Sequence, residues 1–436
     1  MQASVATAST GRRPWPVFAI LFTLMVVDYV DRQVVVSMFP FLKAEWSLSD
    51  GQLGALASAV AITVALGTLP LSLLADRWSA VKSLFLMALV WSCATVACAF
   101  AATYEHLLAA RALVGLGEAA YGSVGAALLA GIFPTRLRST VMGAFLAAAL
   151  VGSVAGLVLG GVVAQAWGWR AGFGIAGAPG LLLALLFLLV AHEPRTEALP
   201  VAPGARTRLR GAARAIAGQL ATRTVIVTCV GAGLQLVALS ALYAWLPSYF
   251  NRYYGVSPAD AGVRASLIVL TGAPGAIVAS LAADRLRERF ARARLYVPAT
   301  AALFTAIFMS AAFGLLPPGP MQFALIVAGG FTLTGTIGPV PAAVVDVVHP
   351  SIRATAAAML ALIQNLFGLA GGPLLGGMLS DRYGLGIAMA VVPLFCLLAA
   401  VVLALAARSY PSIAANMFCT RTPIGTQPPS SAASAP

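Results

Sequence analysis

The sequence has little charge and few groups that could carry out catalysis. Only 9% of its 436 residues are charged, whereas soluble domains carry about 25%. So few charges cannot cover a water-facing surface, and most of the outer surface is therefore expected to face lipid. The three histidines, His106, His192 and His349, lie far apart at helix ends or in loops, without a nucleophile–base pair or a metal cluster. We therefore expect no enzyme activity, no cofactor and no metal.

Cysteine is also scarce, and no nucleotide-binding motif is complete. Four of the five cysteines lie within apolar runs and none has a metal-ligand spacing, so we interpret them as small buried hydrophobic residues. The glycine-rich segment 115–122 lacks the Lys-Ser/Thr pair and the preceding strand of a phosphate loop. Transport driven by ATP is therefore excluded by the absence of its motif.

Long apolar runs fill most of the chain. A helix that crosses about 30 Å of hydrocarbon needs about 20 apolar residues. Such runs are predicted near 16–41, 51–75, 83–102, 105–133, 139–166, 170–191, 224–250, 259–283, 295–316, 320–345, 354–379 and 386–407. The first lacks a short signal-type core and a cleavage site, so we expect it to remain as a helix. The predicted fold class is an all-α integral membrane protein, with twelve transmembrane helices in two pseudo-symmetric six-helix bundles.

A long gap between the sixth and seventh runs divides the chain. It contains Arg206, Arg208, Arg210 and Arg214. The predicted organisation is a cytoplasmic tail (1–15), an N-terminal bundle (16–191), a cytoplasmic central loop (192–223), a C-terminal bundle (224–407) and a disordered tail (408–436). The last segment is rich in Pro, Ser and Ala, a composition typical of disorder.

Basic residues indicate the orientation in the membrane. The net charge of +13 does not form a nucleic-acid patch, because Lys and Arg occupy short gaps between apolar runs. With the N-terminus inside, twenty of the 27 fall on the cytoplasmic side, including Arg12, Arg13 and Arg421. Four fall outside, and three lie in helices: Lys43, Arg170, Arg252 and Arg382, then Arg32, Arg111 and Arg264. We expect a multi-pass cell-membrane protein, monomeric, with both termini cytoplasmic.

The two halves contain matching motifs. Asp76-Arg77 ends the second run, and Asp284-Arg285 ends the eighth. Four glycines of the fifth run, at 152, 156, 160 and 161, recur in the eleventh at 368, 372, 376 and 377. Internal repeats are typical of transporters whose halves move against each other. We interpret the two Asp-Arg pairs as latches of a cytoplasmic gate, and most of the glycines as sites of close helix packing.

Five ionisable residues lie deep within apolar runs. Asp28, Asp31 and Arg32 share one face of the first helix, and Arg111 and Glu118 share one face of the fourth. Buried charges are costly and usually face a cavity or one another. If the two helices are neighbours, three carboxylates face two guanidiniums, which leaves one excess negative charge.

This excess charge suggests coupling to protons. We hypothesise that Asp31 or Glu118, with Asp28 beside them, takes up a proton from outside and releases it inside, coupled to movement of the substrate. Arg32 and Arg111 stay charged and would bias the acids or hold an anionic substrate group. The alternative is a static ion-pair network that holds two helices together. H⁺ is the expected coupling ion, with Na⁺ left open.

The second half has no deep acid. Its helices instead carry aromatic and amide side chains, among them Tyr243, Trp245, Gln364 and Asn365. We predict that these four contact a small-molecule substrate. Lipid-facing or interfacial aromatic residues are the alternative.

Several motifs resemble those of a known family. They are Asp28-Tyr-Val-Asp31-Arg32, Leu48-Ser-Asp-Gly-Gln-Leu-Gly54, Leu74-Ala-Asp76-Arg77, Arg111-Ala-Leu-Val-Gly-Leu-Gly-Glu-Ala119, Gly152-Ser-Val-Ala-Gly156 and Trp169-Arg170. The chain thereby resembles the major facilitator superfamily, and within it the Spinster-like group. The resemblance implies an alternating-access transporter in which Asp31, Arg32 and Glu118 act in proton sensing. It also implies lysolipid-like, amphipathic substrates.

The predicted function is a secondary transporter, proton-coupled, for a small organic or amphipathic solute. Two alternatives remain open: a symporter for an organic anion such as a sugar acid, and a drug-type exporter. A receptor is disfavoured because no substantial soluble domain is present. The sequence leaves open the substrate and the direction of transport.

Overall fold

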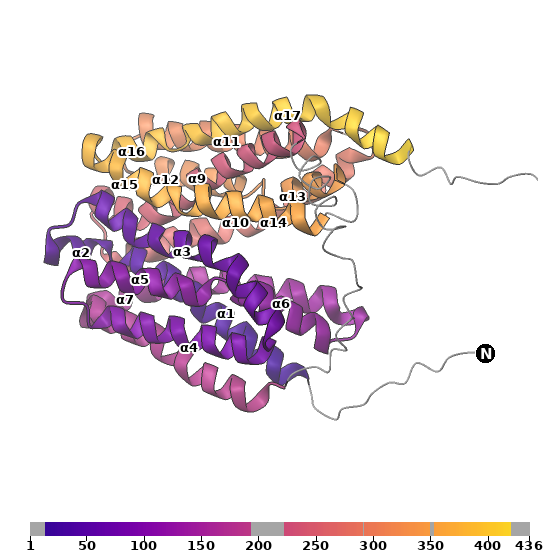
Figure 1. Ribbon diagram of the computed structural model, residues 1–436. Helices are drawn as coiled ribbons and strands as arrows, with labels where there is room; N and C mark the ends of the chain where they lie inside the picture. Colours follow the sequence, from indigo (N-terminus) through magenta and orange to yellow (C-terminus); the bar gives the residue numbers. More distant parts are fainter. Residues whose placement is uncertain (1–13, 193–221, 291, 349–352, 420–436) are drawn as a thin grey trace, which may run out of the picture.

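The computed structural model describes residues 14–192, 222–290, 292–348 and 353–419, which form helices with no strand among them (Figure 1). The helices are α1 (Pro14–Ser37), α2 (Phe39–Trp46), α3 (Asp50–Arg77), α4 (Ala80–Ala99), α5 (Tyr104–Glu118), α6 (Tyr121–Ile132), α7 (Thr135–Val190), α9 (Arg223–Tyr254), α10 (Pro258–Arg287), α11 (Ala293–Leu315), α12 (Pro320–Leu333), α13 (Pro339–Asp346), α14 (Arg353–Ile363), the π-helix η2 (Gln364–Leu369), α15 (Gly371–Tyr383), α16 (Leu385–Val391) and α17 (Leu394–Cys419).

The grouping of these helices is consistent with the twelve passes that the sequence predicts. In the described part of the chain, nine helices are long and apolar enough to span a membrane. The longest, α7, bends at Gly168, whose φ of 82° is readily adopted only by glycine, and so supplies two passes. The charged helix α1 and the pair α12–α13 supply the others. The pairs α5–α6 and α16–α17, and the run α14–η2–α15, each form one interrupted pass.

The passes form two bundles that are joined at one end. Helices α1 to α7 form the N-terminal half and α9 to α17 the C-terminal half (Figure 1). One apolar core is shared by both halves and includes Phe39, Leu42 and Trp245. It lies where α3 begins, and we name this end of the molecule the Asp50 end.

The opposite end holds Pro14 and Arg223, the first residues of α1 and α9, and we name it the terminal end. Two further cores lie here, one within each half: Leu21 belongs to the first and Leu295 to the second. The halves therefore pack together at the Asp50 end and have separate cores at the terminal end.

The repeated glycines pack as the sequence predicts. In each half, three of them contact the first helix of that half (Gly152, Gly156 and Gly160 on α1; Gly368, Gly372 and Gly376 on α9). The fourth contacts the other half: a Cβ on Gly161 would lie 2.5 Å from the Pro258 carbonyl oxygen, and one on Gly377 would lie 2.3 Å from that of Asp50. Two glycine-lined crossings, α7 on α10 and α15 on α3, thus hold the Asp50 end together.

Parts of the predicted organisation lie outside the described residues. These are nearly all of the N-terminal tail, the second part of the C-terminal tail and most of the central loop, with Arg206, Arg208, Arg210, Arg214 and His349. Their predicted roles stay predictions.

Candidate functional site

The deep charges of α1 and α5 meet as two ion-paired groups. Arg111 Nη1 lies 2.9 Å from Asp31 Oδ2, and both side chains are fully buried, with exposures of 1% and 0%. This pair balances one negative charge with one positive charge inside the N-terminal half.

Arg32 forms the second group with two carboxylates. Its Nη2 lies 2.7 Å from Glu118 Oε2, and its Nε lies 3.4 Å from Asp28 Oδ1. Glu118 is completely buried, whereas 21% of the Arg32 side chain is exposed. The Arg32 contact with Glu118 is not aligned as a hydrogen bond, and neither carboxyl oxygen of Glu118 has a hydrogen-bond partner among the described residues. The excess negative charge of the site is therefore localised on this group.

The helix that carries Glu118 ends at that residue. Ala119 and Ala120 interrupt the fourth pass before α6 begins, and Thr68 Oγ1 donates to the Ala119 carbonyl at 2.7 Å. The tenth pass, its counterpart in the second half, breaks between α12 and α13, where Thr334 Oγ1 donates to the Gly272 carbonyl at 2.6 Å. Broken helices within a membrane occur where protein or a cavity satisfies the freed backbone groups.

A cavity of ≈ 330 Å³ lies between the halves, against these charges. The N-terminal half lines it with Tyr29, Arg32, Gln33, Val36, Ala57, Val60, Ala61, Arg111 and Ser153. The C-terminal half contributes Leu239, Ser240, Tyr243, Ala244, Ile337, Leu369 and Pro373. Both charged side chains of this lining come from the N-terminal half, and the opposite wall is mostly apolar. One wall can thus bind an anionic group while the other accepts an apolar one.

The four substrate contacts predicted in the second half differ in their position relative to the cavity. Tyr243 lines the cavity. Trp245 is buried next to it at the Asp50 end, where its Nε1 donates to the Pro373 carbonyl at 3.0 Å. Gln364 and Asn365 begin the π-helical segment of the eleventh pass, and neither is among the residues that line the cavity.

Other lining residues had no role in the sequence prediction. Tyr29 and Gln33 lie next to Asp28 and Arg32 in α1, and the Tyr29 ring lies 5.2 Å below the Arg32 guanidinium. Their positions beside the charged residues are a signal that could have found them. Ser153 and Ser240 have no such signal in the sequence.

The predicted gate residues lie at the terminal end. Asp76, Arg77 and Arg285 are exposed, and Asp284 pairs with Arg294 at 3.2 Å. Because the halves have separate cores at this end, none of these contacts joins one half to the other in this conformation. Their role as a cytoplasmic gate stays a prediction.

A larger charged cluster at the terminal end centres on Asp346, which the sequence prediction missed. Its carboxylate pairs with Arg294, lies 3.3 Å from Arg287 Nη2, and accepts a hydrogen bond from the Tyr410 hydroxyl at 3.0 Å. These contacts join four passes within the C-terminal half.

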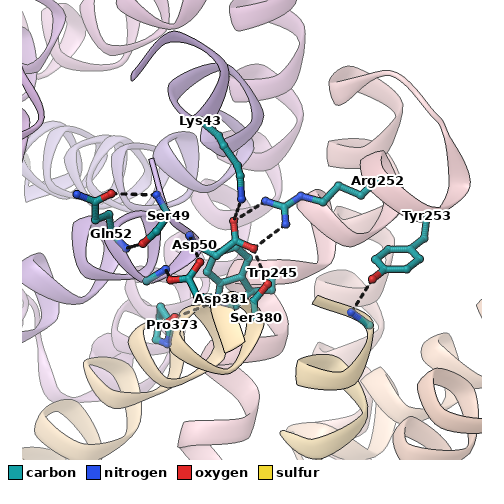
Figure 2. Close-up of polar contacts among 12 residues, drawn as sticks. Lys43, Ser49, Asp50, Gln52, Trp245, Arg252, Tyr253, Pro373, Ser380 and Asp381 are labelled. Carbon is teal, nitrogen blue, oxygen red and sulfur yellow. Dashed lines mark hydrogen bonds and ion pairs between the residues drawn. The ribbon is translucent and has the colours of Figure 1, made fainter. Parts of the chain in front are cut away.

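A second missed cluster surrounds Asp50 and is shown in Figure 2. Arg252 binds the Asp50 carboxylate with both Nη atoms, at 2.6 and 2.7 Å, and Lys43 Nζ lies 2.6 Å away. The Ser380 hydroxyl also donates to this carboxylate, and Asp381 accepts from the backbone N–H groups of α3. The capping sequence Ser49-Asp-Gly-Gln52 signals the start of α3, but nothing in the sequence indicates its partners.

Another ion pair at the Asp50 end stays within one half. Glu45 accepts from Trp169 Nε1 at 2.6 Å and from Arg170 Nη1 at 2.7 Å. The hydrogen bond from Trp169, together with the Arg170 charge, lowers the pKa of Glu45. Glu45 is therefore ionised at neutral pH.

Two helical bundles around a charged cavity define a membrane transporter, and comparisons with known proteins identify its family. The family model of the Major Facilitator Superfamily matches residues 21–372, and the chain belongs to that superfamily. The Spinster-like group, which the sequence motifs resemble, is represented among its relatives at 25% identity. It is a transporter and not an enzyme.

The relatives are named for different functions. A hexuronate transporter of Bacillus subtilis (strain 168) is 26% identical over 375 residues, covering 85% of this chain and 88% of the relative. An MFS-type efflux pump of Mycolicibacterium smegmatis is 28% identical over 373 residues, 85% of each. The sphingosine-1-phosphate transporter SPNS2 of Danio rerio is 25% identical over 387 residues, 85% of this chain and 77% of the relative.

Among solved structures, a bacterial homolog of the human lysosomal transporter Spinster, inward-facing and occupied, superimposes with a TM-score of 0.81. It is 23% identical, and the match covers 92% of this chain and 99% of that one. The D-xylose–proton symporter has a TM-score of 0.70 at 15% identity, over 89% and 97% of the two chains. These likenesses establish the fold.

Proposed function

We propose that this protein couples the movement of an amphipathic organic solute to protons by alternating access. The observation that carries the proposal is the sharing of Arg32 by two buried carboxylates, Glu118 and Asp28, beside the cavity. A single guanidinium balances only one of them. A proton on Glu118 neutralises the other negative charge, and the Glu118 oxygen that does not pair with Arg32, Oε1, has no hydrogen-bond partner among the described residues.

The exchange of partners links the proton to the solute. When Glu118 is ionised, Arg32 is occupied by two carboxylates. When Glu118 is protonated, the partly exposed Arg32 guanidinium becomes available to an anionic group in the cavity. Asp31 stays paired with Arg111 throughout and holds the first and fourth passes together.

The orientation and the substrate class belong to the same proposal. The Asp50 end faces outward and the terminal end faces the cytoplasm, in agreement with the distribution of Lys and Arg. The cavity has a charged wall and an apolar wall, which fits a solute with an anionic head and an apolar body, such as a lysolipid-like molecule. The Danio rerio relative, a sphingosine-1-phosphate transporter by name, supports this class.

An organic-anion symporter is the second candidate. It is favoured by the two guanidiniums in the cavity lining, which could bind a carboxylate without any apolar tail. The Bacillus subtilis relative, a hexuronate transporter by name, supports it.

Glu118→Gln is expected to lose proton-driven accumulation and to keep exchange of solute. The amide cannot carry the proton, whereas exchange requires only the cavity. With purified protein in liposomes, uptake driven by a pH gradient should fall at least about tenfold, which corresponds to about 1.4 kcal/mol of lost coupling. Counterflow at equal pH on both sides should persist.

Glu105→Gln is the matched control, because Glu105 is an exposed acid at the start of the same helix. It should leave both measurements unchanged. Full pH-driven accumulation by Glu118→Gln would show that the charges are only a static network.

The substrate class can be tested by ligand-induced thermal stabilisation of the purified protein. A lysolipid with a phosphate head should raise the unfolding temperature, because a ligand that binds only the folded state stabilises it. Arg32→Gln should reduce this shift. Stabilisation by hexuronates alone would overturn the amphipathic assignment in favour of the organic-anion symporter.

A further inference from the structure

The Asp50 cluster has no part in the proton site, yet it joins the two halves directly. We propose that it is the ion-pair gate that holds the Asp50 end closed, and that it separates when the cavity opens to that end. The proposal adds a gate to the proposed alternating-access function and rests on it in that respect.

Each half supplies part of the cluster. Asp50 belongs to the N-terminal half, and its carboxylate is bound by Arg252 from α9 and by Ser380 from α15. In the opposite sense, the Asp381 carboxylate of the C-terminal half accepts from the backbone N–H groups of Asp50 and Gly51, at 2.7 Å each. Figure 2 shows these side chains pointing toward one another between the halves. Neither half contains the complete cluster.

The close packing of α3 against α15 buries this cluster. The backbones of α3 and α15 are so close that a Cβ on Gly51 would lie 2.8 Å from Asp381 Oδ2, and one on Gly54 would lie 2.3 Å from the Pro373 carbonyl oxygen. The Asp50 side chain is 3% exposed at this crossing. A buried carboxylate without a counter-charge is costly, and the closed arrangement balances it with Lys43 from the same half and with Arg252 from the other half.

Lys43 is the partner that Asp50 keeps when the gate opens. It belongs to the N-terminal half, so its contact with Asp50 does not depend on the position of the other half. When the halves separate, Asp50 keeps Lys43 and water, whereas Arg252 and Ser380 leave. The charges that face the cluster, Lys43 and Arg252 against Asp50 and Asp381, balance in the closed state.

The gate can be tested by comparing variants that lose contacts between the halves with variants that lose contacts within one half. Spin labels at Glu105→Cys and Pro318→Cys, both exposed, would report the distance across the Asp50 end after replacement of the native cysteines. Position 105 follows Tyr104, whose hydroxyl donates to the Gln52 carbonyl, and position 318 precedes Gly319, whose carbonyl accepts from Tyr254. The measurement is a pulsed electron–electron distance distribution of the full chain in lipid nanodiscs.

Asp50→Asn and Arg252→Gln should each raise the ratio of long to short distances by roughly tenfold or more, because each loses charge-assisted hydrogen bonds between the halves. Lys43→Gln removes a charge from the same carboxylate, and Glu45→Gln breaks the Glu45–Arg170 pair at the same end; both should change the ratio by less than about twofold. If Asp50→Asn fails to fold, Arg252→Gln alone decides, since that side chain is 28% exposed.

Unchanged distances in Arg252→Gln, or equal shifts in Arg252→Gln and Lys43→Gln, would overturn the gate. The readout needs neither solute nor proton gradient. A protein without proton-driven uptake but with the expected distances would contradict the proposed coupling and leave the gate standing.

Discussion

Arg111→Met is expected to destabilise the folded protein by about 3–5 kcal/mol, the cost of leaving a buried charge without its partner. Arg111 and Asp31 are 1% and 0% exposed, and the Arg111 Nη1 to Asp31 Oδ2 distance is 2.9 Å. Methionine fills much of the space of arginine but leaves the Asp31 carboxylate unpaired. Equilibrium unfolding in mixed micelles would measure the loss.

A double-mutant cycle separates the charge from the packing. Asp31→Asn alone should also be destabilising, because it leaves the Arg111 guanidinium unpaired. The Arg111→Met/Asp31→Asn protein should be more stable than either single variant, since no unpaired charge remains. Additive losses in the double variant would contradict this account and would show that shape, not charge, decides stability here.

Gly377→Ala is expected to prevent the Asp50 end from closing. The new methyl carbon would lie 2.3 Å from the Asp50 carbonyl oxygen and 3.0 Å from Gly51 Cα, both backbone atoms that cannot rotate away. An overpacked contact of this kind costs roughly 1–3 kcal/mol, which is enough to shift the balance between two conformations by about tenfold. The distance between labels at 105 and 318 would measure the shift.

Gly371→Ala is the control from the same helix. Its methyl carbon would have only Leu375 Cδ1 nearby, at 3.9 Å, so the substitution should leave the distances unchanged. Alanine is in addition the better helix former, by up to about 1 kcal/mol. Equal effects of Gly371→Ala and Gly377→Ala would show that helix propensity, not the contact between halves, is responsible.

The partners of the buried charges could be predicted only in part. Because ionisable residues in hydrocarbon face one another, Asp28, Asp31 and Arg32 could be expected to meet Arg111 and Glu118. The structure decides that Asp31 pairs with Arg111, and that Glu118 joins Asp28 on Arg32. Which acid meets which guanidinium depends on the rotation of two helices about their axes, and spacing along one helix does not contain that information.

The Asp50 cluster shows the same limit more strongly. Asp50, Arg252 and Asp381 belong to three different passes, and each stands in the sequence as an ordinary charge near a helix end. Their contact depends on how the two halves are docked. Trp245 is a similar case, because an aromatic residue near the cavity could equally face substrate, lipid or, as the structure has it, the Pro373 carbonyl.

The sequence by itself determined that the chain is an all-α protein that crosses the membrane many times and that five charges lie within its apolar runs. Both follow from the cost of placing polar groups in hydrocarbon, which acts on each helix separately. Only the tertiary structure decided which faces meet. In a membrane helix, lipid-facing and protein-facing sides are equally apolar, so the pattern along the chain does not distinguish them. The partners of Arg32, the walls of the cavity and the closed Asp50 end all depend on that choice of face.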